Sequence, residues 1–460
     1  MSSFPAKSRL YAFQIFNALS FWIIIKTPMV LLVAWLGGGS GAVGLVIAIM
    51  PFLTILQIPS TRWISKLGYR RTMLMGWAGR TMVLSGFVLI PLLADTFSTQ
   101  TLVGAVVVIM FCWSLLRGMA NAAWLPWLRA LVPEEQRGRF LAGEHRYIQL
   151  MGLLIFFFSG LILGKDAGPL RFSLIFLISF CSAIVSLKFL SRIPHVKIPE
   201  RDKTETSLLK SVRDALSLVN FRRFLMFCFS WTVANKGFEA FAVLFMKRHT
   251  PFTDRGILWL GAASSIGMIC VLFFSGKLMD KWGSRPIVNL CLFGTFIYYF
   301  LWFLISENVI AESYPLLAAV YFFYGAIRAT IWISMWRLTM MFVPRDYNLV
   351  ALAIYTSGMG ILAGATPLVW GVILDRLPAD APLSPFGWFF LAGVVLNMVT
   401  FFMLQRVEEE KAEPTVNVAL QIFLQPVQSF SSLMAYIPRS QHLPSISKID
   451  ENKKDNQDDA

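Results

Sequence analysis

Residues 276–285 read GKLMDKWGSR and form a short charged loop between two long apolar runs. A related loop stands earlier in the chain, where residues 66–71 read KLGYRR and again separate two apolar runs. The glycines at equivalent positions, Gly68 and Gly283, are 215 residues apart. This spacing is the first indication of an internal repeat.

A second pair of landmarks recurs at nearly the same spacing. Arg117 precedes Pro133 by sixteen residues, and Arg328 precedes Pro344 by sixteen residues, which gives an offset of 211. Two independent landmarks at almost one offset indicate that the chain consists of two related halves.

The composition places most of the chain in lipid. Of 460 residues, 56% are hydrophobic and 15% are charged, and the mean hydropathy is +0.63. A water-soluble chain carries about 25% charged residues. A spanning helix needs about 20 apolar residues, and the chain has twelve such runs. They lie near residues 10–36, 43–64, 72–93, 102–131, 146–164, 170–191, 222–246, 257–279, 286–306, 313–341, 349–373 and 384–404.

The expected fold is therefore an all-α polytopic membrane protein with twelve transmembrane helices in two pseudo-symmetric six-helix halves. The expected parts are an N-terminal half at 1–191, a cytoplasmic linker at 192–221, a C-terminal half at 222–405 and a largely disordered cytoplasmic tail at 406–460. Within that tail, Val416 to Tyr436 is apolar enough for a helix that lies on the membrane surface.

Basic residues predict the orientation in the membrane. The net charge is +15, and Lys and Arg gather in alternate short loops, as they do on the cytoplasmic side of inner-membrane proteins. Both termini are therefore expected in the cytoplasm, and the charge needs no nucleic-acid partner. The basic residues of these loops include Arg62, Lys66, Arg70, Arg71, Arg129, Arg137, Arg139, Lys277, Lys281, Arg285, Arg337 and Arg345.

The loop at 276–285 is similar to a family signature. The pattern Gly276-x-x-x-Asp280-Lys281-x-Gly283-x-Arg285 resembles the motif between the eighth and ninth helices of the major facilitator superfamily. The resemblance implies a secondary transporter of twelve helices, and it leaves the substrate open because members of this family move many kinds of solute.

The first-half loop departs from this signature. It keeps Lys66, Gly68 and Arg70, but Thr61 and Ser65 stand where the signature has a glycine and an acid. Because Ser65 cannot carry a charge, we expect a weaker gate in this half.

The resemblance implies a gating role for eight residues of the two loops. These are Lys66, Gly68, Arg70, Gly276, Asp280, Lys281, Gly283 and Arg285. The alternative is that both loops only anchor the topology.

Two arginines are expected deep in the membrane. Sixteen helical residues put Arg117 about 24 Å from Pro133, and Arg328 lies at the equivalent depth. Buried arginines face a partner or a wet cavity, and two of them could bind a carboxylate or phosphate from both halves. The alternative is that each one pairs with backbone carbonyls or a neighbouring acid.

Further candidates lie in the first and seventh spans. We expect Lys26, Lys236 and Asn17 to join the two arginines in binding substrate, although Asn17 could instead connect helices. Glu239 is the clearest deep acid and the expected proton-coupling group, since a carboxylate in a low-dielectric site can exchange a proton near neutrality. Alternatively, Lys236 and Glu239 neutralise each other at i and i+3. Arg80 is left out because it could extend to the membrane surface.

Other classes of function lack support in the sequence. No complete nucleotide-binding motif is visible, and the four histidines and five cysteines form no ligand cluster, so we expect no enzyme, no cofactor and no metal. The prediction is a monomeric secondary transporter in the inner membrane that imports a small organic anion with protons. The alternatives are an exporter of amphipathic or cationic compounds, or a transporter-like sensor or assembly partner.

Overall fold

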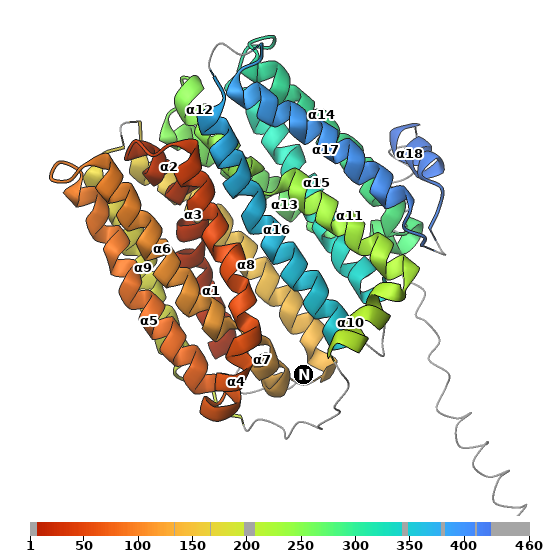
Figure 1. The fold of residues 1–460 in the computed structure, drawn as a ribbon, viewed down its shortest axis with the longest axis horizontal. Coiled ribbons are helices and arrows are strands. Elements are labelled where there is room, and N and C mark those ends of the chain that lie inside the picture. Colours follow the sequence, from red (N-terminus) through yellow and green to blue (C-terminus); the bar gives the residue numbers. More distant parts are fainter. Residues whose placement is uncertain are drawn as a thin grey trace, which may run out of the picture.

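The computed structural model describes residues 7–132, 134–165, 167–196, 208–342, 348–378, 382–409 and 412–424, and these residues are almost entirely helical. Figure 1 shows two groups of long helices side by side, one from each half of the chain. The predicted fold of twelve spans in two halves is confirmed.

The first half contains six spans, and several of them consist of more than one helical segment. Its elements are α1 (Lys7–Ile25), α2 (Thr27–Trp35), α3 (Ser40–Leu53), η1 (Thr54–Leu56), α4 (Gln57–Leu67), α5 (Tyr69–Leu89), η2 (Ile90–Leu93), α6 (Thr99–Asn121), α7 (Trp124–Leu131), α8 (Glu134–Leu163) and α9 (Pro169–Leu190).

The second half follows a short helix in the linker, and one more helix follows its last span. The elements are α10 (Leu208–Ser217), α11 (Val219–Asn235), α12 (Phe238–His249), α13 (Asp254–Trp282), α14 (Ser284–Ser306), α15 (Tyr314–Phe342), α16 (Asn348–Arg376), α17 (Pro385–Gln405) and α18 (Thr415–Leu424). The predicted surface helix at 416–436 overlaps α18, and its part beyond residue 424 lies outside the described residues, as does most of the predicted disordered tail.

Ten helical spans among the described residues are long and apolar enough to cross a membrane. The other two spans are interrupted: the second consists of α3, η1 and α4, and the seventh consists of α11 and α12. The first span is also broken, at Lys26 between α1 and α2. Continuous helices were expected over 10–36 and 222–246, so the breaks correct that expectation.

Local chemistry explains both breaks. Pro28 lies in the first turn of α2, where its missing N–H breaks no helical hydrogen bond. In the interior of a continuous helix the same proline would remove a hydrogen bond and clash with the preceding turn, so the helix is interrupted before it. Gly237 has a φ of +89°, a left-handed conformation that glycine adopts readily. The breaks place Lys26 and Lys236 at the ends of short helices near the middle of their spans.

The fifth span also differs from its expected bounds. It was expected over 146–164, but α8 begins at Glu134. Glu144 is therefore part of this helix and is buried. The hydropathy pattern missed these turns because their apolar content is low, although their backbone continues the same helix.

The most extensive contacts between the two halves are those of α3 with α16, α8 with α13, and α2 with α12, and smaller ones join α3 to α12, η1 to α16 and α2 to α13. One end of the molecule, which we call the closed end, carries the turn at residues 37–41. There the Asp375 carboxylate accepts hydrogen bonds from the backbone N–H groups of Ser40 (2.8 Å) and Gly41 (2.6 Å). Arg248 donates to the Gly38 carbonyl oxygen at 2.8 Å.

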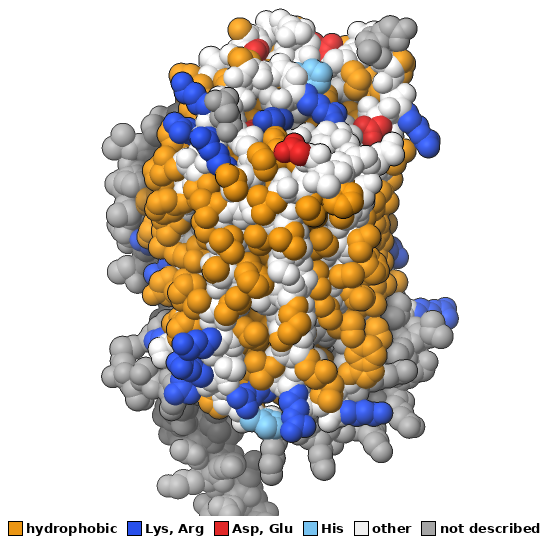
Figure 2. Space-filling model, turned by 90° about the vertical axis from the view of Figure 1, so that its left-hand side faces the viewer, with side chains coloured by type: hydrophobic (Ala, Val, Ile, Leu, Met, Phe, Trp, Pro, Cys, Tyr) orange, Lys and Arg blue, Asp and Glu red, His pale blue; other side chains and the backbone are white. Residues whose placement is uncertain are grey.

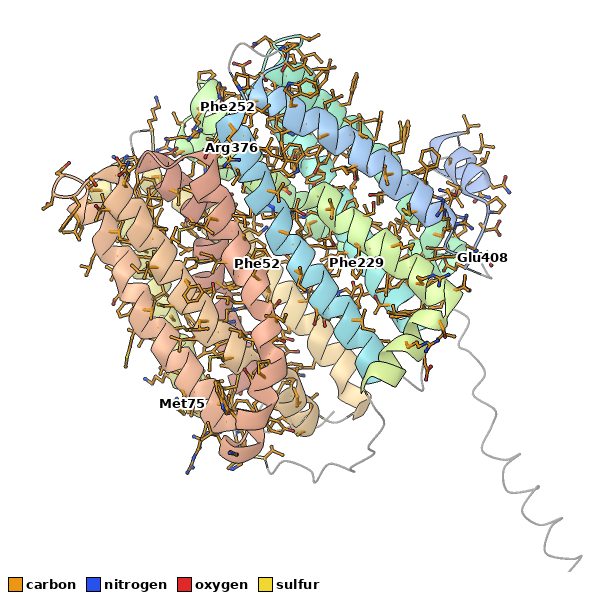
Figure 3. The ribbon with its side chains drawn as sticks, viewed as in Figure 1. Phe52, Met75, Phe229, Phe252, Arg376 and Glu408 are labelled. Atoms are coloured by element: carbon orange, nitrogen blue, oxygen red, sulfur yellow. The ribbon has the colours of Figure 1, made fainter. Side chains whose placement is uncertain are left out.

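The outer surface has the pattern expected for a protein in a bilayer. Figure 2 shows on one face a broad band of hydrophobic side chains, with Lys and Arg gathered toward both ends. Met75 on α5 lies at the outer edge of the molecule (Figure 3) and is 64% exposed. Exposed apolar side chains of this kind are favourable in contact with lipid and unfavourable in contact with water.

Candidate functional site

A cavity of about 510 Å³ lies between the two halves. Its walls come from α1, α2, α3 and α8 on one side and from α11, α12, α13, α15 and α16 on the other, with one residue from α6. It includes His145 in the first half of α8 and Met335 in the last third of α15, so it extends away from the closed end.

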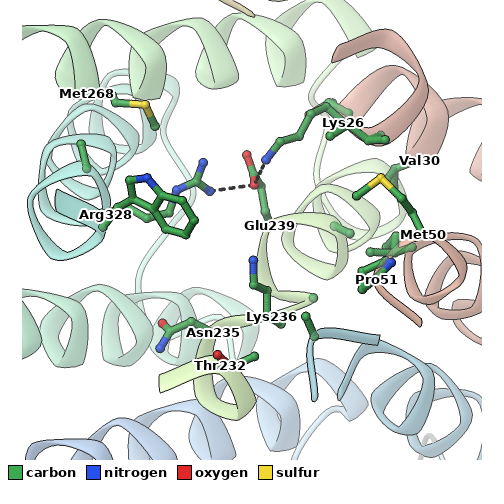
Figure 4. A pocket seen from close by; sticks show the side chains of 18 of the residues that line it. Lys26, Val30, Met50, Pro51, Thr232, Asn235, Lys236, Glu239, Met268 and Arg328 are labelled. Atoms are coloured by element: carbon green, nitrogen blue, oxygen red, sulfur yellow. Dashed lines mark hydrogen bonds and ion pairs between the residues drawn. The ribbon is translucent and has the colours of Figure 1, made fainter. Parts of the chain in front are cut away.

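An ion-pair triad joins the two halves inside this cavity (Figure 4). One carboxylate oxygen, Glu239 Oε2, accepts from Lys26 Nζ at 2.6 Å and from Arg328 Nη1 at 2.7 Å. Each of the three side chains is only 20–31% exposed. Charge-assisted hydrogen bonds of this length are among the stronger polar contacts in proteins. Lys26 is the only one of the three from the first half.

Helix breaks position this triad. Glu239 lies in the first turn of α12, where the positive end of the helix dipole stabilises a negative charge. A Cβ atom on Gly237 would lie 3.1 Å from Pro367 and 3.2 Å from Phe241, so α16 packs closely over the break.

Lys236 points into the same space (Figure 4), but Glu239 forms its ion pairs with Lys26 and Arg328. The alternative in which Lys236 and Glu239 neutralise each other on one helix face therefore fails, because the break separates them. The charged lining residues that the structure describes are three cations and one anion, a net charge of +2 with His145 neutral.

The remaining lining is largely apolar. Most polar lining groups are already engaged, since His145 contacts Gln149 at 3.2 Å and Asn235 donates to the Asn397 side chain at 3.0 Å. Thr232 donates to the Cys228 carbonyl oxygen at 2.9 Å.

Arg117 does not line the cavity formed by the described residues. Its guanidinium carbon lies 4.4 Å from the centre of the Phe21 ring and 5.9 Å from that of Trp113. Met110, seven residues earlier on the same face of α6, does line the cavity. Arg117 thus lies about two turns further from the closed end, and the structure does not bring it to Arg328.

Asn17 belongs to a separate polar network within the first half. Its Oδ1 accepts from Arg80 Nη2 at 2.5 Å and from Trp77 Nε1 at 3.3 Å, and its amide donates to Gln14 at 3.3 Å. Gln14 in turn donates to Glu144. Two amides therefore connect a buried carboxyl group to a buried guanidinium.

Sequence reasoning missed both ends of this network. Arg80 was expected to extend to the membrane surface, but it is fully buried and its guanidinium lies 4.3 Å from the Trp77 ring centre. Trp77 precedes it by three residues, which is the spacing of neighbours on one helix face. That spacing is the signal that could have indicated burial.

The second-half signature loop contacts neighbouring helix ends. Asp280 pairs with Arg337 at 2.9 Å, and Arg285 donates to the Gln405 carbonyl oxygen at 2.9 Å. The Glu409 carboxylate accepts from the backbone N–H groups of Ser284 (3.0 Å) and Arg285 (2.7 Å), which caps the start of α14. Lys281 lies over the Trp282 ring, and Gly276 has open space beside it.

The first-half loop is simpler. Arg70 donates to the Ser191 carbonyl oxygen at the end of α9, and Lys66 is exposed. Gly68 and Gly283 share a positive φ, +82° and +88°, which confirms that the two loops have equivalent turns. The gating role of their residues stays a prediction.

Comparison with known proteins identifies the family. A family model described as Major Facilitator Superfamily matches residues 10–345 and 240–438. The chain belongs to the Major Facilitator Superfamily. The predicted family is thus confirmed, and it indicates a membrane transporter. A comparison with curated protein sequences gave no match.

Solved structures of transporters share the fold of this superfamily member. A D-xylose-proton symporter has a TM-score of 0.68 at 15% identity, over 90% of this chain and 99% of that one. A bacterial homologue of the iron transporter ferroportin has 0.65 at 12%, over 89% and 100%. The nucleoside transporter NupG has 0.63 at 12%, over 88% and 99%. At these identities the likeness concerns the fold and gives no substrate.

Proposed function

We propose that this protein is a secondary transporter that carries a small organic anion, together with protons, across the inner membrane by alternating access. The observation that carries the proposal is the cavity charge. Three cations face one carboxylate in a space that reaches both halves, so the described lining residues carry an excess charge of +2. A cationic substrate would meet repulsion there, which disfavours the exporter of cationic compounds.

The geometry of the triad supports a mode of anion binding. A substrate carboxylate or phosphate can replace Glu239 on Lys26 and Arg328, and Lys236 lies beside it to balance the added charge. Because Lys26 belongs to one half and Arg328 to the other, this exchange changes the contact between the halves. Such a change in interdomain contacts is what alternating access around a midplane site requires.

Proton coupling follows from the same competition. When the substrate takes Lys26 and Arg328, Glu239 loses both of its cationic partners in a largely apolar cavity. An uncompensated carboxylate in such a place favours its protonated form. One proton would therefore accompany each anion, and the cycle would draw on a proton gradient.

Two predicted residues act outside the triad in this proposal. Arg117 lies beyond Met110 in the direction away from the closed end, where its charge would attract anions toward the cavity. Asn17 contributes through the position of α1, because it ties that helix to Arg80.

Orientation and gating complete the proposal. With both termini in the cytoplasm, the closed end faces outward and the cavity is directed inward. The contacts of Asp375 and Arg248 then hold the external gate, while the loops with Asp280 and Arg285 hold the cytoplasmic ends of the second half.

Uptake into liposomes by the purified protein tests the proposal. We expect flux of organic anions, and we expect Arg328→Met to reduce it at least tenfold because the variant keeps an apolar side chain but loses the charge. Lys188→Gln removes an exposed positive charge at the end of α9 and serves as the control, with flux near wild type.

One observation favours a second role. Val416, Leu420 and Leu424 recur every four residues on α18 and are 50–73% exposed, as in a helix with a further partner. A folded protein without any solute flux would support an assembly or sensor role and would overturn the transport proposal.

A further inference from the structure

We propose that the substrates are amphipathic monocarboxylates, with one carboxylate head and an apolar body of several carbons. This inference rests on the proposed anion transport and narrows its substrate class. The head would bind at the triad, and the body would lie along the apolar walls of the same cavity.

Glu239 indicates the chemistry of the head group, because the protein's own carboxylate occupies the position between the two cations. A single oxygen, Oε2, bridges Lys26 Nζ and Arg328 Nη1 at 2.6 and 2.7 Å. The two donors already converge on one carboxylate oxygen, so a substrate carboxylate fits without rearranging them. One negative charge in place of another also preserves the charge balance of the site.

The walls indicate the chemistry of the body. Six methionines line the cavity: Met29, Met50, Met110, Met268, Met335 and Met359. Methionine side chains are unbranched and polarisable, so they adapt to apolar ligands of different shape. The methionines come from both halves, and Met50 lies close to the triad (Figure 4).

Hydroxyl-rich solutes fit this lining poorly. Thr232, His145 and Gln149 already have hydrogen-bond partners, and Asn235 donates to the Trp231 carbonyl oxygen and to Asn397. The Asn235 side chain still has one buried oxygen, Oδ1, that accepts no hydrogen bond in the described part of the chain. A ligand with several hydroxyl groups would find few partners here, and each hydroxyl group left unpaired carries a cost.

The size of the cavity agrees with a body of several carbons. About 510 Å³ lies within the range of roughly 300–1,000 Å³ typical of sites that enclose drug-sized ligands. A two-carbon acid would leave most of the apolar wall uncovered, so each added methylene should improve binding.

Binding of a series of unbranched carboxylates with two to eight carbons tests the inference. The readout is the dissociation constant from thermal stabilisation of the full chain in lipid nanodiscs at constant ionic strength. We expect about fourfold tighter binding for each methylene, the equivalent of about 0.8 kcal/mol, until the cavity is filled. Alcohols and amines of equal length should bind at least tenfold more weakly than the acids.

Three variants separate the contribution of the head from that of the body. Arg328→Met should weaken every acid by a similar factor, because it removes a partner of the head and keeps the wall apolar. Met50→Gln should reduce the gain per methylene to about twofold or less, and should therefore weaken long acids more than acetate. Met75→Gln, on the outer side of α5, is the matched control and should behave as wild type.

Each outcome has a distinct meaning. Equal affinity across the series, or equally tight binding of polyhydroxylated acids, would overturn the amphipathic class while anion transport stands. Alcohols that bind as tightly as acids of equal length, or an undiminished gain per methylene in Met50→Gln, would show partition into lipid and would also overturn it. If no carboxylate or other anion binds or is taken up, the proposed function itself fails.

Discussion

The side chain of Glu239 holds one cation from each half of the molecule, Lys26 from the first and Arg328 from the second. Burying three charges is unfavourable unless they pair with one another. Removing one of them leaves a buried charge without its partner. Under the proposed function, Glu239 therefore sets both how firmly the two halves are joined at this site and how readily an anion binds there.

Glu239→Gln removes the carboxylate that competes with the substrate. We expect anion binding about tenfold tighter, or about 1.4 kcal/mol, because Lys26 and Arg328 lose their resident acceptor. In wild type, affinity should rise as the pH falls, since protonation of Glu239 has the same effect as the amide. In the variant this pH dependence should disappear, and a pH gradient should no longer drive accumulation while anion exchange persists.

The measurements are binding between pH 5 and 8 and uptake with and without a pH gradient. Asp254→Asn is a control, because this buried acid pairs with Lys247 at 2.5 Å away from the cavity lining. Gradient-driven uptake by Glu239→Gln at the wild-type rate would remove Glu239 from the coupling step.

At the scale of elements, the interruptions in the first and seventh spans form the site. A side chain at a helix end can reach into a cavity, and the freed backbone groups need partners because lipid offers none. At the first break, the Lys26 carbonyl oxygen accepts from Met29 N–H at 3.0 Å. At the second, the Lys236 N–H donates to the Thr232 carbonyl oxygen at 2.9 Å. Both breaks are thus satisfied locally and held in place.

Gly237→Ala tests the second break. A left-handed conformation costs a residue with a Cβ about 1–2 kcal/mol, and the new atom would also press on Pro367 and Phe241 at 3.1–3.2 Å. We expect lower thermal stability and a loss of transport of at least tenfold, because a change in the backbone at the break would displace both Lys236 and Glu239. Gly104→Ala in α6 is the control, since nothing lies within 4 Å of its added atom and alanine favours a helix. Unchanged transport in Gly237→Ala would show that the break does not position the site.

At the scale of the whole molecule, the closed end depends on close contact between α3 and α16. An added Cβ on Gly44 would lie 2.3 Å from the Pro367 carbonyl oxygen, and one on Gly371 would lie 2.7 Å from that of Ser40. Small residues allow two helix backbones to approach this closely. Such close packing stabilises helix association in a membrane, where there is no hydrophobic driving force between helices. The Asp375 carboxylate adds two hydrogen bonds at the same place.

Gly44→Ala should therefore open this end. The added methyl group separates α3 from α16, which shifts the population toward the state in which the closed end is open. Spin labels at Gln100 and Ser313, exposed positions near this end on opposite halves, should report a longer and broader distance distribution than in wild type. The same labels in Gly104→Ala should match wild type, and an unchanged distribution in Gly44→Ala would show that this packing does not hold the gate.

Much of this architecture could be predicted because it depends on local properties of the chain. The length of an apolar run decides whether it can span lipid, and the two loops with Gly68 and Gly283 recur at one spacing and adopt the same positive φ. Lys26, Lys236, Glu239 and Arg328 could be singled out as deep charges, because a charge inside an apolar run is visible in the sequence.

The partners of those charges could not be predicted. Arg117 and Arg328 are equivalent in the repeat, yet Arg328 pairs with Glu239 while Arg117 stacks on Phe21. The direction of a side chain depends on the rotation of its helix and on the neighbouring helices, and both are set by packing over long sequence distances. Glu144 was missed for a related reason, since α8 extends beyond its apolar run.

The amino-acid sequence is sufficient to predict the twelve spans, the two related halves and the deep charges, because lipid requires apolar runs of a given length and the repeat preserves spacing. The link that Glu239 makes between Lys26 of one half and Arg328 of the other, 213 and 89 residues away in sequence, depends on tertiary packing. The same packing places Asn17 in contact with Arg80 rather than in the cavity lining. Such contacts arise where helices from distant parts of the chain pack together, and no local pattern encodes them.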